Sequence, residues 1–273
     1  MLSIIISSYQ PQYFAALEKN IAETCGVEFE IIKIENPALM GICEAYNKGA
    51  EKAKYDNLLF IHEDILISTM NWGKPLILSL SEAKTGIIGI AGGTYVPAAP
   101  YGWFTTMNNA KISIIQHKKG GSKIVEKTFE TKKEKVIAVD GVFLGIKKSI
   151  FNKFKFDENL KGYHGYDTEL SLRISSQYQN YVTSEILIEH FSQGNPDHKW
   201  LESNIYTRNK LGSNFNITIN KDLEYQMYER FVRDYFKYHP KNLLTLIQIL
   251  KFFPIFKIGR RKYLPLLKFT ITQ

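Results

Sequence analysis

The chain is poor in cysteine, with only Cys25 and Cys43. Two thiols give no disulfide framework, so the composition excludes a small disulfide-stapled domain and predicts a reducing, cytoplasmic location. No apolar run approaches the roughly 20 residues that a membrane-spanning helix needs. The opening residues Met1–Ser8 have no basic stretch before a short apolar segment, so we expect a strand there and not a secretory signal.

Acidic residues are absent from the end of the chain. The 273 residues carry 35 Lys and Arg against 27 Asp and Glu, yet residues 235–273 hold eight basic and no acidic side chains. The preceding residues are therefore balanced, with 27 charges of each sign. A neutral body argues against an enzyme with a basic face for nucleic acid, and we expect no nucleic-acid partner.

The basic tail has two interpretations. Residues 243–256 are hydrophobic around Lys251, and Arg260-Arg261-Lys262 follow before a second apolar stretch interrupted by Pro265. This pattern fits a segment, 241–273, that lies on an anionic membrane surface at the inner face of the cell membrane. It also fits a terminal helix packed on the domain with a solvated basic face. Since no repeat or low-complexity linker is present, we expect one domain over residues 1–215 and a helical, basic tail over 216–273.

Strand and helix patterns alternate along the first 90 residues. The predicted strands are Leu2–Ser8, Glu28–Ile34, Asn57–Ile61 and Gly86–Ala91, and the helices begin at Pro11 or cover Gly41–Lys54 and Trp72–Ala83. This order predicts an α/β fold with a mixed, mostly parallel sheet flanked by helices.

The pattern changes after Gly93. Residues 95–109 form a loop rich in Pro, Gly and aromatic residues, and 111–135 look like a polar hairpin or mobile loop that turns at Gly120-Gly121-Ser122. The later elements are a strand over 136–147 broken at Asp140-Gly141, a helix over 167–176, a strand over 181–189, and helices over 198–210 and 221–238.

The triplet His62-Glu63-Asp64 directly follows the apolar strand 57–61. A carboxylate at the carboxyl end of a buried parallel strand can hold a hard divalent cation and leave positions open for phosphate oxygens. The simpler alternative is that Glu63 and Asp64 are solvated loop charges that cap the helix starting near Trp72. His62 can be a metal ligand, a ribose contact or a hydrogen-bonded core histidine.

Two further groups stand at the ends of predicted elements. Asp167 opens a helix, where it can cap the helix and, staying ionised, act as a base. His190 closes an apolar strand beside Ser192 and Gly194, which favours a ligand role over a purely structural histidine. Carboxylates and imidazoles at the ends of separate elements are how α/β enzymes assemble a site.

An ordered set of segments carries a family resemblance: SIIISSYQ, EIIKIEN, AYNKGAEKA, LLFIHEDILI, AVDGVFLGIKK, FDENLKGYHGYDTELSLR and ILIEHFSQG. Together, over about residues 1–205, they resemble the nucleotide-diphospho-sugar glycosyltransferases of family 2, which have a Rossmann-like GT-A fold. The chain is most similar to the subgroup whose metal motif reads His-x-Asp in place of Asp-x-Asp. It departs from the family at Tyr46, where an Arg often precedes the Asn-x-Gly motif.

The resemblance implies a role for each matching residue. Asp64 would bind Mn²⁺ or Mg²⁺ on the donor diphosphate, with His190 and His62 as further ligands, and Asp167 would be the catalytic base. Donor contacts would come from Ser7, Tyr9, Glu35 and Asn36 at the nucleotide base, Asn47 and Glu63 at the nucleoside, and Asp140 and Gly141 at the sugar and acceptor.

The implied activity is an inverting, metal-dependent sugar transfer. A UDP-, GDP- or dTDP-linked donor would pass its sugar to a hydroxyl of a glycan or lipid-linked acceptor, in surface polysaccharide synthesis. Trp103, Trp200 and Tyr101 are candidates for stacking on sugar rings, although core packing explains an aromatic residue about as often. The segments 95–109 and 111–135 would order over the donor as lids.

Two other function classes stay open. One is another metal-dependent nucleotide enzyme, a nucleotidyltransferase or a nucleotide-sugar hydrolase. The residues after the first strand, Ser7-Ser8-Tyr9-Gln10-Pro11, are neither Gly-rich nor basic, which counts against a nucleotidyltransferase. The other is an inactive glycan- or nucleotide-binding module, which the presence of both Asp64 and Asp167 disfavours.

Overall fold

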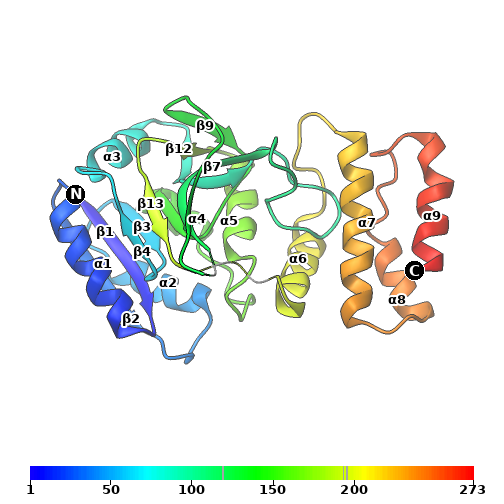
Figure 1. The fold of residues 1–273 in the computed structure, drawn as a ribbon, viewed down its shortest axis with the longest axis horizontal. Helices are drawn as coiled ribbons and strands as arrows, with labels where there is room; N and C mark the ends of the chain where they lie inside the picture. Colours follow the sequence, from blue (N-terminus) through cyan, green and yellow to red (C-terminus); the bar gives the residue numbers. More distant parts are fainter. Residues whose placement is uncertain (119, 193, 195) are drawn as a thin grey trace.

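A computed structural model describes residues 1–118, 120–192, 194 and 196–273. Its first part alternates strands and helices as the sequence predicts (Figure 1). The elements are β1 (Leu2–Ser8), α1 (Pro11–Thr24), β2 (Phe29–Glu35), α2 (Ile42–Lys52), β3 (Asn57–Ile61), α3 (Gly73–Ser81) and β5 (Thr85–Gly89).

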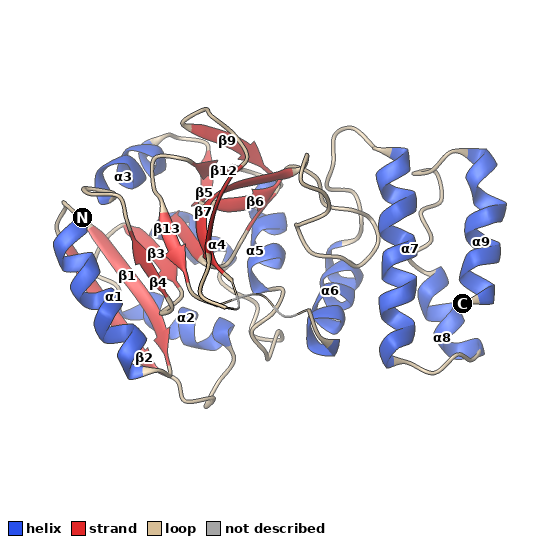
Figure 2. Cartoon of the chain, in the orientation of Figure 1, coloured by secondary structure: helices blue, strands red, loops and turns tan. Residues whose placement is uncertain are grey.

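These strands belong to a seven-stranded sheet in the order β2-β1-β3-β11-β5-β12-β9 (Figure 2). β11 (Phe143–Lys147) runs antiparallel to both β3 and β5, between which it lies. β12 (Gln179–Thr183) is parallel to β5, and the edge strand β9 (Lys133–Val136) is antiparallel to β12. The predicted α/β fold with a mixed, mostly parallel sheet is therefore confirmed.

Helices cover both faces of this sheet because successive side chains of a strand point to opposite sides. Leu58 and Phe60 of β3 pack into a core with residues of α2 and α5 (Tyr166–Ser175). Leu59 and Ile61 pack into a second core with residues of α1 and α3. A strand buried on both sides in this way delivers His62 to the carboxyl edge of the sheet.

A smaller second sheet completes the site region. Its strands are β10 (Ala138–Val139), β6 (Ala91–Gly93), β7 (Ala110–His117), β13 (Ile188–His190), β4 (Ile65–Ile67) and β8 (Lys123–Lys127), which pairs with β7. The β7–β8 hairpin is the one that the polar segment 111–135 predicts; part of its connection, Lys119, lies outside the described residues. The prediction of one strand over 181–189 is wrong, because β12 and β13 belong to different sheets.

Of the remaining helices, α4 (Lys148–Phe154) lies beside β11 and α5, and the others lie on the side of the molecule away from β2 (Figure 1). These others are α6 (His198–Leu211), α7 (Lys221–Tyr238), α8 (Leu243–Leu250) and α9 (Tyr263–Thr272), with a short 3₁₀ helix (Arg260–Lys262) before α9. α7, α8 and α9 share a core that includes Phe231, Ile249 and Leu266. Among the described residues, no helix combines the length and the apolar character that crossing a bilayer requires.

Candidate active site and metal centre

Two neighbouring cavities open at the carboxyl edge of β1 and β3. The smaller, about 370 Å³, is lined by Ser7 and Tyr9 at the end of β1 and by His62 and Asp64 after β3. The larger, about 540 Å³, extends toward α5 and α6 and contains Asp140 and Asp167. His62, Tyr163, Tyr166 and Ser192 line both cavities, so a molecule that filled both would pass these residues.

Three potential metal ligands meet at this junction: His62, Asp64 and His190. The pairing of β13 between β4 and β7 explains the meeting, since His190 pairs with Ile65 on one side and Gln116 on the other. Asp64 immediately precedes β4, and its carbonyl accepts a hydrogen bond from Phe191 N at 3.1 Å. The second sheet therefore brings His190 beside His62 and Asp64, which precede it by more than a hundred residues in the chain.

The distances in this group suit a divalent cation. His62 Nδ1 lies 3.8 Å from one carboxylate oxygen of Asp64, and His190 Nε2 lies 3.7 Å from the other. Neighbouring ligand atoms around a divalent ion with bonds of about 2.0 to 2.2 Å lie roughly 3.0 to 3.5 Å apart. Small side-chain movements would close the gap, so the three residues fit a metal ion.

Each imidazole is held through the ring nitrogen that faces away from Asp64. His190 Nδ1 lies 3.2 Å from Gln116 Oε1, and the Gln116 amide nitrogen donates to three backbone carbonyls, which fixes the oxygen toward the histidine. Nδ1 therefore carries the proton and Nε2 presents a lone pair toward Asp64. His62 Nε2 lies 2.8 Å from the hydroxyl of the buried Tyr166. Such partners orient ligating histidines in metal sites.

A second group of potential ligands, His198, Glu202 and His239, lies where α6 meets the end of α7. His198 and Glu202 are about half exposed, and the group lines neither cavity. His62, Asp64 and His190 line the two cavities, so this group is the better candidate for a metal site.

Replacing Tyr166 by phenylalanine should weaken metal binding by a factor of about 10 to 100, because the partner that orients His62 is lost. Isothermal titration with Mn²⁺ would measure the change. Tyr46→Phe is the matched control: Tyr46 is also fully buried, but its hydroxyl donates to the carbonyl of Ile61 and not to a histidine. Equal losses in both variants would mean that Tyr166 acts only through packing.

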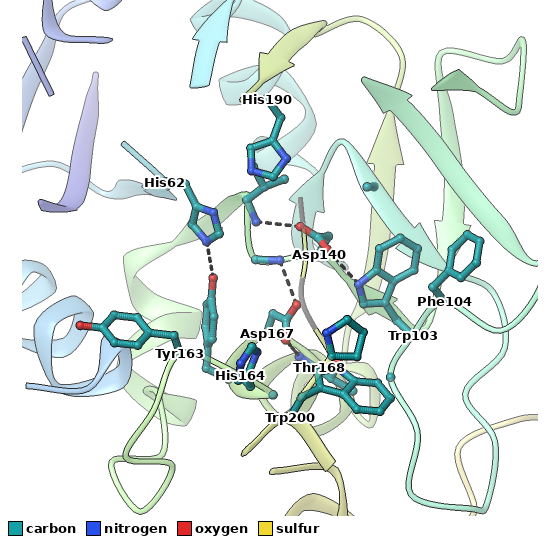
Figure 3. Close-up of a pocket in the computed structure, with 18 of the residues that line it drawn as sticks. His62, Trp103, Phe104, Asp140, Tyr163, His164, Asp167, Thr168, His190 and Trp200 are labelled. Carbon is teal, nitrogen blue, oxygen red and sulfur yellow. Dashed lines mark hydrogen bonds between the residues drawn. The ribbon is translucent and has the colours of Figure 1, made fainter. Parts of the chain in front are cut away.

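The larger cavity brings together side chains from segments that are far apart in the chain, as Figure 3 shows. Trp103 and Trp200 line it, as does Asp140, whose Oδ2 accepts a hydrogen bond of 3.0 Å from Trp103 Nε1. The other Asp140 oxygen accepts from Val142 N. Both tryptophans that the sequence proposes for sugar stacking therefore face the same cavity as the two aspartates.

Asp167 lies in the first turn of α5 and not at its N-cap, which is Gly165 with a positive φ of 75°. Its two carboxylate oxygens accept hydrogen bonds from Gly141 N at 3.0 Å and Thr168 N at 2.7 Å. Burial, with a smaller contribution from the nearby charge of Asp140, raises the pKa of Asp167 to about 7. A carboxyl group with a pKa near neutrality is suited to take and release a proton.

The predicted donor-binding residues divide into two sets. Ser7, Tyr9 and Glu63 line the smaller cavity. Glu63 is buried, which differs from a solvated loop charge, and its Oε1 accepts hydrogen bonds from Tyr9 N and Gln10 N. Its Oε2 is buried without a hydrogen-bond partner among the described residues.

Glu35, Asn36 and Asn47 line neither cavity. Glu35 is exposed beside Lys33. The Asn36 amide bonds backbone atoms of Leu39 and Met40 in the loop after β2, and its nitrogen also donates at 3.1 Å to the hydroxyl of Ser7, which lines the smaller cavity. The Asn47 amide bonds both backbone polar groups of Phe156 and a carboxylate oxygen of Glu158. A direct donor contact for these three residues stays a prediction.

Sequence reasoning missed Tyr166 and Gln116, the two partners of the histidines. Tyr166 precedes the predicted base directly, and this position was the only available signal. Gln116 sits in an alternating strand and gives no signal of its own. Gly141 packs directly against Tyr166. A Cβ at position 141 would lie 2.0 Å from the Tyr166 hydroxyl.

Comparisons with known proteins add to this geometry. The family described as "Glycosyltransferase like family" matches residues 3–210. Residues 1–349 of TarS from S. aureus are similar in structure, with a TM-score of 0.58, 14% identity, and coverage of 99% of this chain and 87% of that one. The mannosyltransferase PcManGT from Pyrobaculum calidifontis, in complex with GDP-Man and Mn²⁺, gives 0.50 and 11%, with coverage of 99% and 74%.

A third similar structure is GalNAc-T7 with UDP, GalNAc and Mn²⁺, with a TM-score of 0.56 and 13% identity. All of this chain is covered, and it spans 57% of GalNAc-T7. Identities this low show a shared fold and nothing finer. No curated protein sequence matches the chain.

Proposed function

The chain belongs to the glycosyltransferase-like family, and on that premise we propose that it transfers a sugar from a nucleotide-diphosphate donor to an acceptor hydroxyl with inversion. The family and the GT-A fold are those that the sequence motifs predict. Within the family we propose that the chain belongs to the subgroup with His-x-Asp, here His62 to Asp64, in the place of Asp-x-Asp.

The observation that carries this proposal is the junction of the two cavities at His62, Asp64 and His190. A nucleoside fits beside Ser7, Tyr9 and Glu63 in the smaller cavity, and a sugar with its acceptor fits in the larger one. The diphosphate then lies at the junction. The structurally similar proteins with UDP and Mn²⁺ or with GDP-Man and Mn²⁺ support a donor of this class and a divalent metal.

In the proposed reaction Asp167 accepts the proton of the acceptor hydroxyl as its oxygen attacks the anomeric carbon. The bond from that carbon to the diphosphate oxygen breaks, and the configuration inverts because attack and departure occur on opposite faces. Gly141 N and Thr168 N hold the Asp167 carboxylate in place. A bound Mn²⁺ or Mg²⁺ would supply charge stabilisation for the leaving diphosphate.

The sugar would lie among the aromatic residues of the larger cavity. We propose that Trp103 and Trp200 stack on sugar rings of the donor or acceptor. Trp200 is held edge-on against Tyr101, with ring centroids 5.1 Å apart. Trp103 donates its indole proton to Asp140, which in turn stands near the proposed donor sugar with Gly141.

The rate of transfer should depend on pH through Asp167. Because its pKa is raised to about 7 and the base must be ionised, we expect kcat to rise tenfold per pH unit up to about pH 7 and then to level off. A pH–rate profile between pH 5 and 9 would measure this. An acidic limb centred near pH 4 would contradict the raised pKa of the group whose ionisation limits the rate.

A direct test is the release of nucleoside diphosphate from UDP-, GDP- and dTDP-sugars, with and without Mn²⁺ and a panel of glycoside acceptors. Transfer predicts metal-dependent release that increases when an acceptor is added. Release at the same rate without any acceptor would instead favour the hydrolase interpretation. An enzyme that bound donors but released nothing under any condition would fit the inactive binding module.

We also propose that residues 1–215 are the catalytic unit and that the tail over 216–273 meets an anionic membrane, as an enzyme with a lipid-linked acceptor would need. The support is exposed apolar surface beyond α7: Leu243, Leu244, Ile247, Ile255, Phe256, Leu264 and Ile271 are all exposed. These side chains share the tail with the basic residues that follow Tyr235. Apolar and basic groups together are the two signals that stable membrane attachment requires.

A further inference from the structure

A third cavity, of about 240 Å³, lies between the end of α6 and the connection from α8 to α9. It is separate from the two cavities of the active site, with which it shares no residue. Its walls come from the catalytic body, through Ala98 and Arg208, and from the tail, through Lys251, Ile255 and Lys257. A ligand here would therefore contact both parts of the chain.

Three basic side chains, and no carboxylate among the described residues, line this cavity. Arg208 is only 2% exposed; its Nε and Nη2 donate to the carbonyls of Pro97 and Tyr101, and its Nη1 has no hydrogen-bond partner among the described residues. Lys257 donates to the carbonyl of Ser213. No acidic residue is among the described residues that line the cavity.

The buried acid Glu224 acts on both cations but has hydrogen-bond partners of its own. Glu224 accepts hydrogen bonds from the Tyr95 hydroxyl at 2.6 Å and from Ala98 N at 3.0 Å. Burial lowers the pKa of both Arg208 and Lys257, and the charge of Glu224 raises both; for Lys257 the charge of Arg208 lowers the pKa by a smaller amount. Two cations confined in a site of low dielectric repel each other, and a bound anion would relieve that cost.

Exposed apolar side chains lie at the cavity and next to it in the chain. Ile255, which lines the cavity, is 57% exposed, and Phe256, between Ile255 and Lys257, is 90% exposed. Phe256 also has a positive φ of 67°, an uncommon conformation for a bulky residue, while its backbone N–H donates to the Tyr263 hydroxyl. An anion alone would not use these side chains, whereas a phosphate attached to hydrocarbon chains would use both the cations and the apolar side chains.

We propose that this cavity binds the phosphate headgroup of an anionic lipid, with Arg208, Lys251 and Lys257 around the phosphate and Ile255 and Phe256 among the acyl chains. This inference rests on the membrane attachment proposed above and specifies the lipid group that the protein binds. Ala98 lines the cavity, and Tyr101 and Trp103 follow it in the same loop. Lipid binding would therefore place the membrane near the segment that carries Trp103.

Sedimentation of the full chain with phosphatidylcholine vesicles containing phosphatidic acid tests the proposal. The double variant Lys251→Gln/Lys257→Gln should bind these vesicles about 25-fold more weakly, since each basic side chain near an anionic surface contributes a factor of about five. Phe256→Ser should also weaken binding. The matched control is Lys19→Gln/Lys132→Gln, which removes two well-exposed lysines from the body and should change binding less than twofold.

Two comparisons identify the ligand. Vesicles made equally anionic with a fatty acid, which has no phosphate, should bind more weakly than those with phosphatidic acid, and inorganic phosphate should compete. Equal binding to both vesicles, or equal losses in the double variant and its control, would overturn the site. Stabilisation by inorganic phosphate without vesicle binding would overturn the lipid as its ligand.

The outcome is independent of sugar transfer. Thermal stabilisation by donors should be unchanged in Lys251→Gln/Lys257→Gln, and vesicle binding should be unchanged in Asp64→Ala. Arg208 is left intact because its bonds to Pro97 and Tyr101 hold the loop in place. Loss of vesicle binding with retained donor binding would therefore separate the lipid site from the active site.

Discussion

Replacing Asp167 by asparagine is expected to lower kcat by a factor of about 10² to 10⁴, the usual contribution of a positioned general base, while the donor Kd changes less than twofold. The amide has nearly the same shape but cannot accept the acceptor's proton. Gly141 N can still donate to the amide oxygen, which keeps one of the two hydrogen bonds that hold the side chain, while the bond from Thr168 N is lost. Single-turnover transfer and donor titration measure the two quantities separately.

Thermal stability provides the control for this variant. A buried carboxyl whose pKa is raised to about 7 costs the folded protein stability when it ionises, so Asp167→Asn should have a higher Tm at pH 8. The gain should shrink as the pH falls toward 5, where the folded wild type keeps the proton. Asp234 on α7 is 24% exposed and pairs with Lys237, so Asp234→Asn should leave kcat unchanged and change Tm only slightly, because such a surface ion pair contributes little. Loss of donor binding in Asp167→Asn would instead mean that the residue is structural.

Replacing Asp64 by alanine is the second large change. Asp64 is the only anionic residue among the three proposed ligands, so its loss leaves two neutral imidazoles to face a doubly charged ion. We expect metal affinity to fall more than about 100-fold, beyond the effect of losing a supporting residue, and kcat/KM to fall at least as far at limiting Mn²⁺. Metal titration and steady-state kinetics at several Mn²⁺ concentrations measure both.

Glu202→Ala is the matched control for Asp64→Ala, because it removes the carboxylate of the second candidate metal group among the described residues, which also has two histidines. It should leave activity and its Mn²⁺ dependence unchanged. If Glu202→Ala lowered activity and Asp64→Ala did not, the metal would be assigned to the wrong group. Excess Mn²⁺ should partly restore Asp64→Ala, since His62 and His190 remain.

One part of the candidate site is predictable from the sequence, because its potential metal ligands directly follow a buried strand. His62 to Asp64 emerge from β3, and the apolar run before them is a local pattern that any reader of the chain can find. β1, β2, β3 and their helices were predictable for the same reason, since each has its own periodicity. The alternating burial of Leu58 to Ile61 gives this strand a helix layer on both faces.

The features that the sequence did not reveal depend on contacts between distant segments. β11 is inserted between β3 and β5, and β13 is split from β12 by pairing with β4 and β7. β4 and β13 have three residues each, too short for a periodic signal. Tyr166 and Gln116 form hydrogen bonds with histidines that are 104 and 74 residues away in the chain, so no local pattern points to them.

The most direct test of the metal-centred donor site is thermal stabilisation by UDP-, GDP- and dTDP-sugars, measured with and without Mn²⁺ on the wild type and on Asp64→Ala. The structure predicts that at least one nucleotide sugar raises the Tm of the wild type only when Mn²⁺ is present, and that Asp64→Ala abolishes this shift. If no nucleotide sugar stabilises the wild type in a metal-dependent way, or if Asp64→Ala responds like the wild type, the proposed site is contradicted.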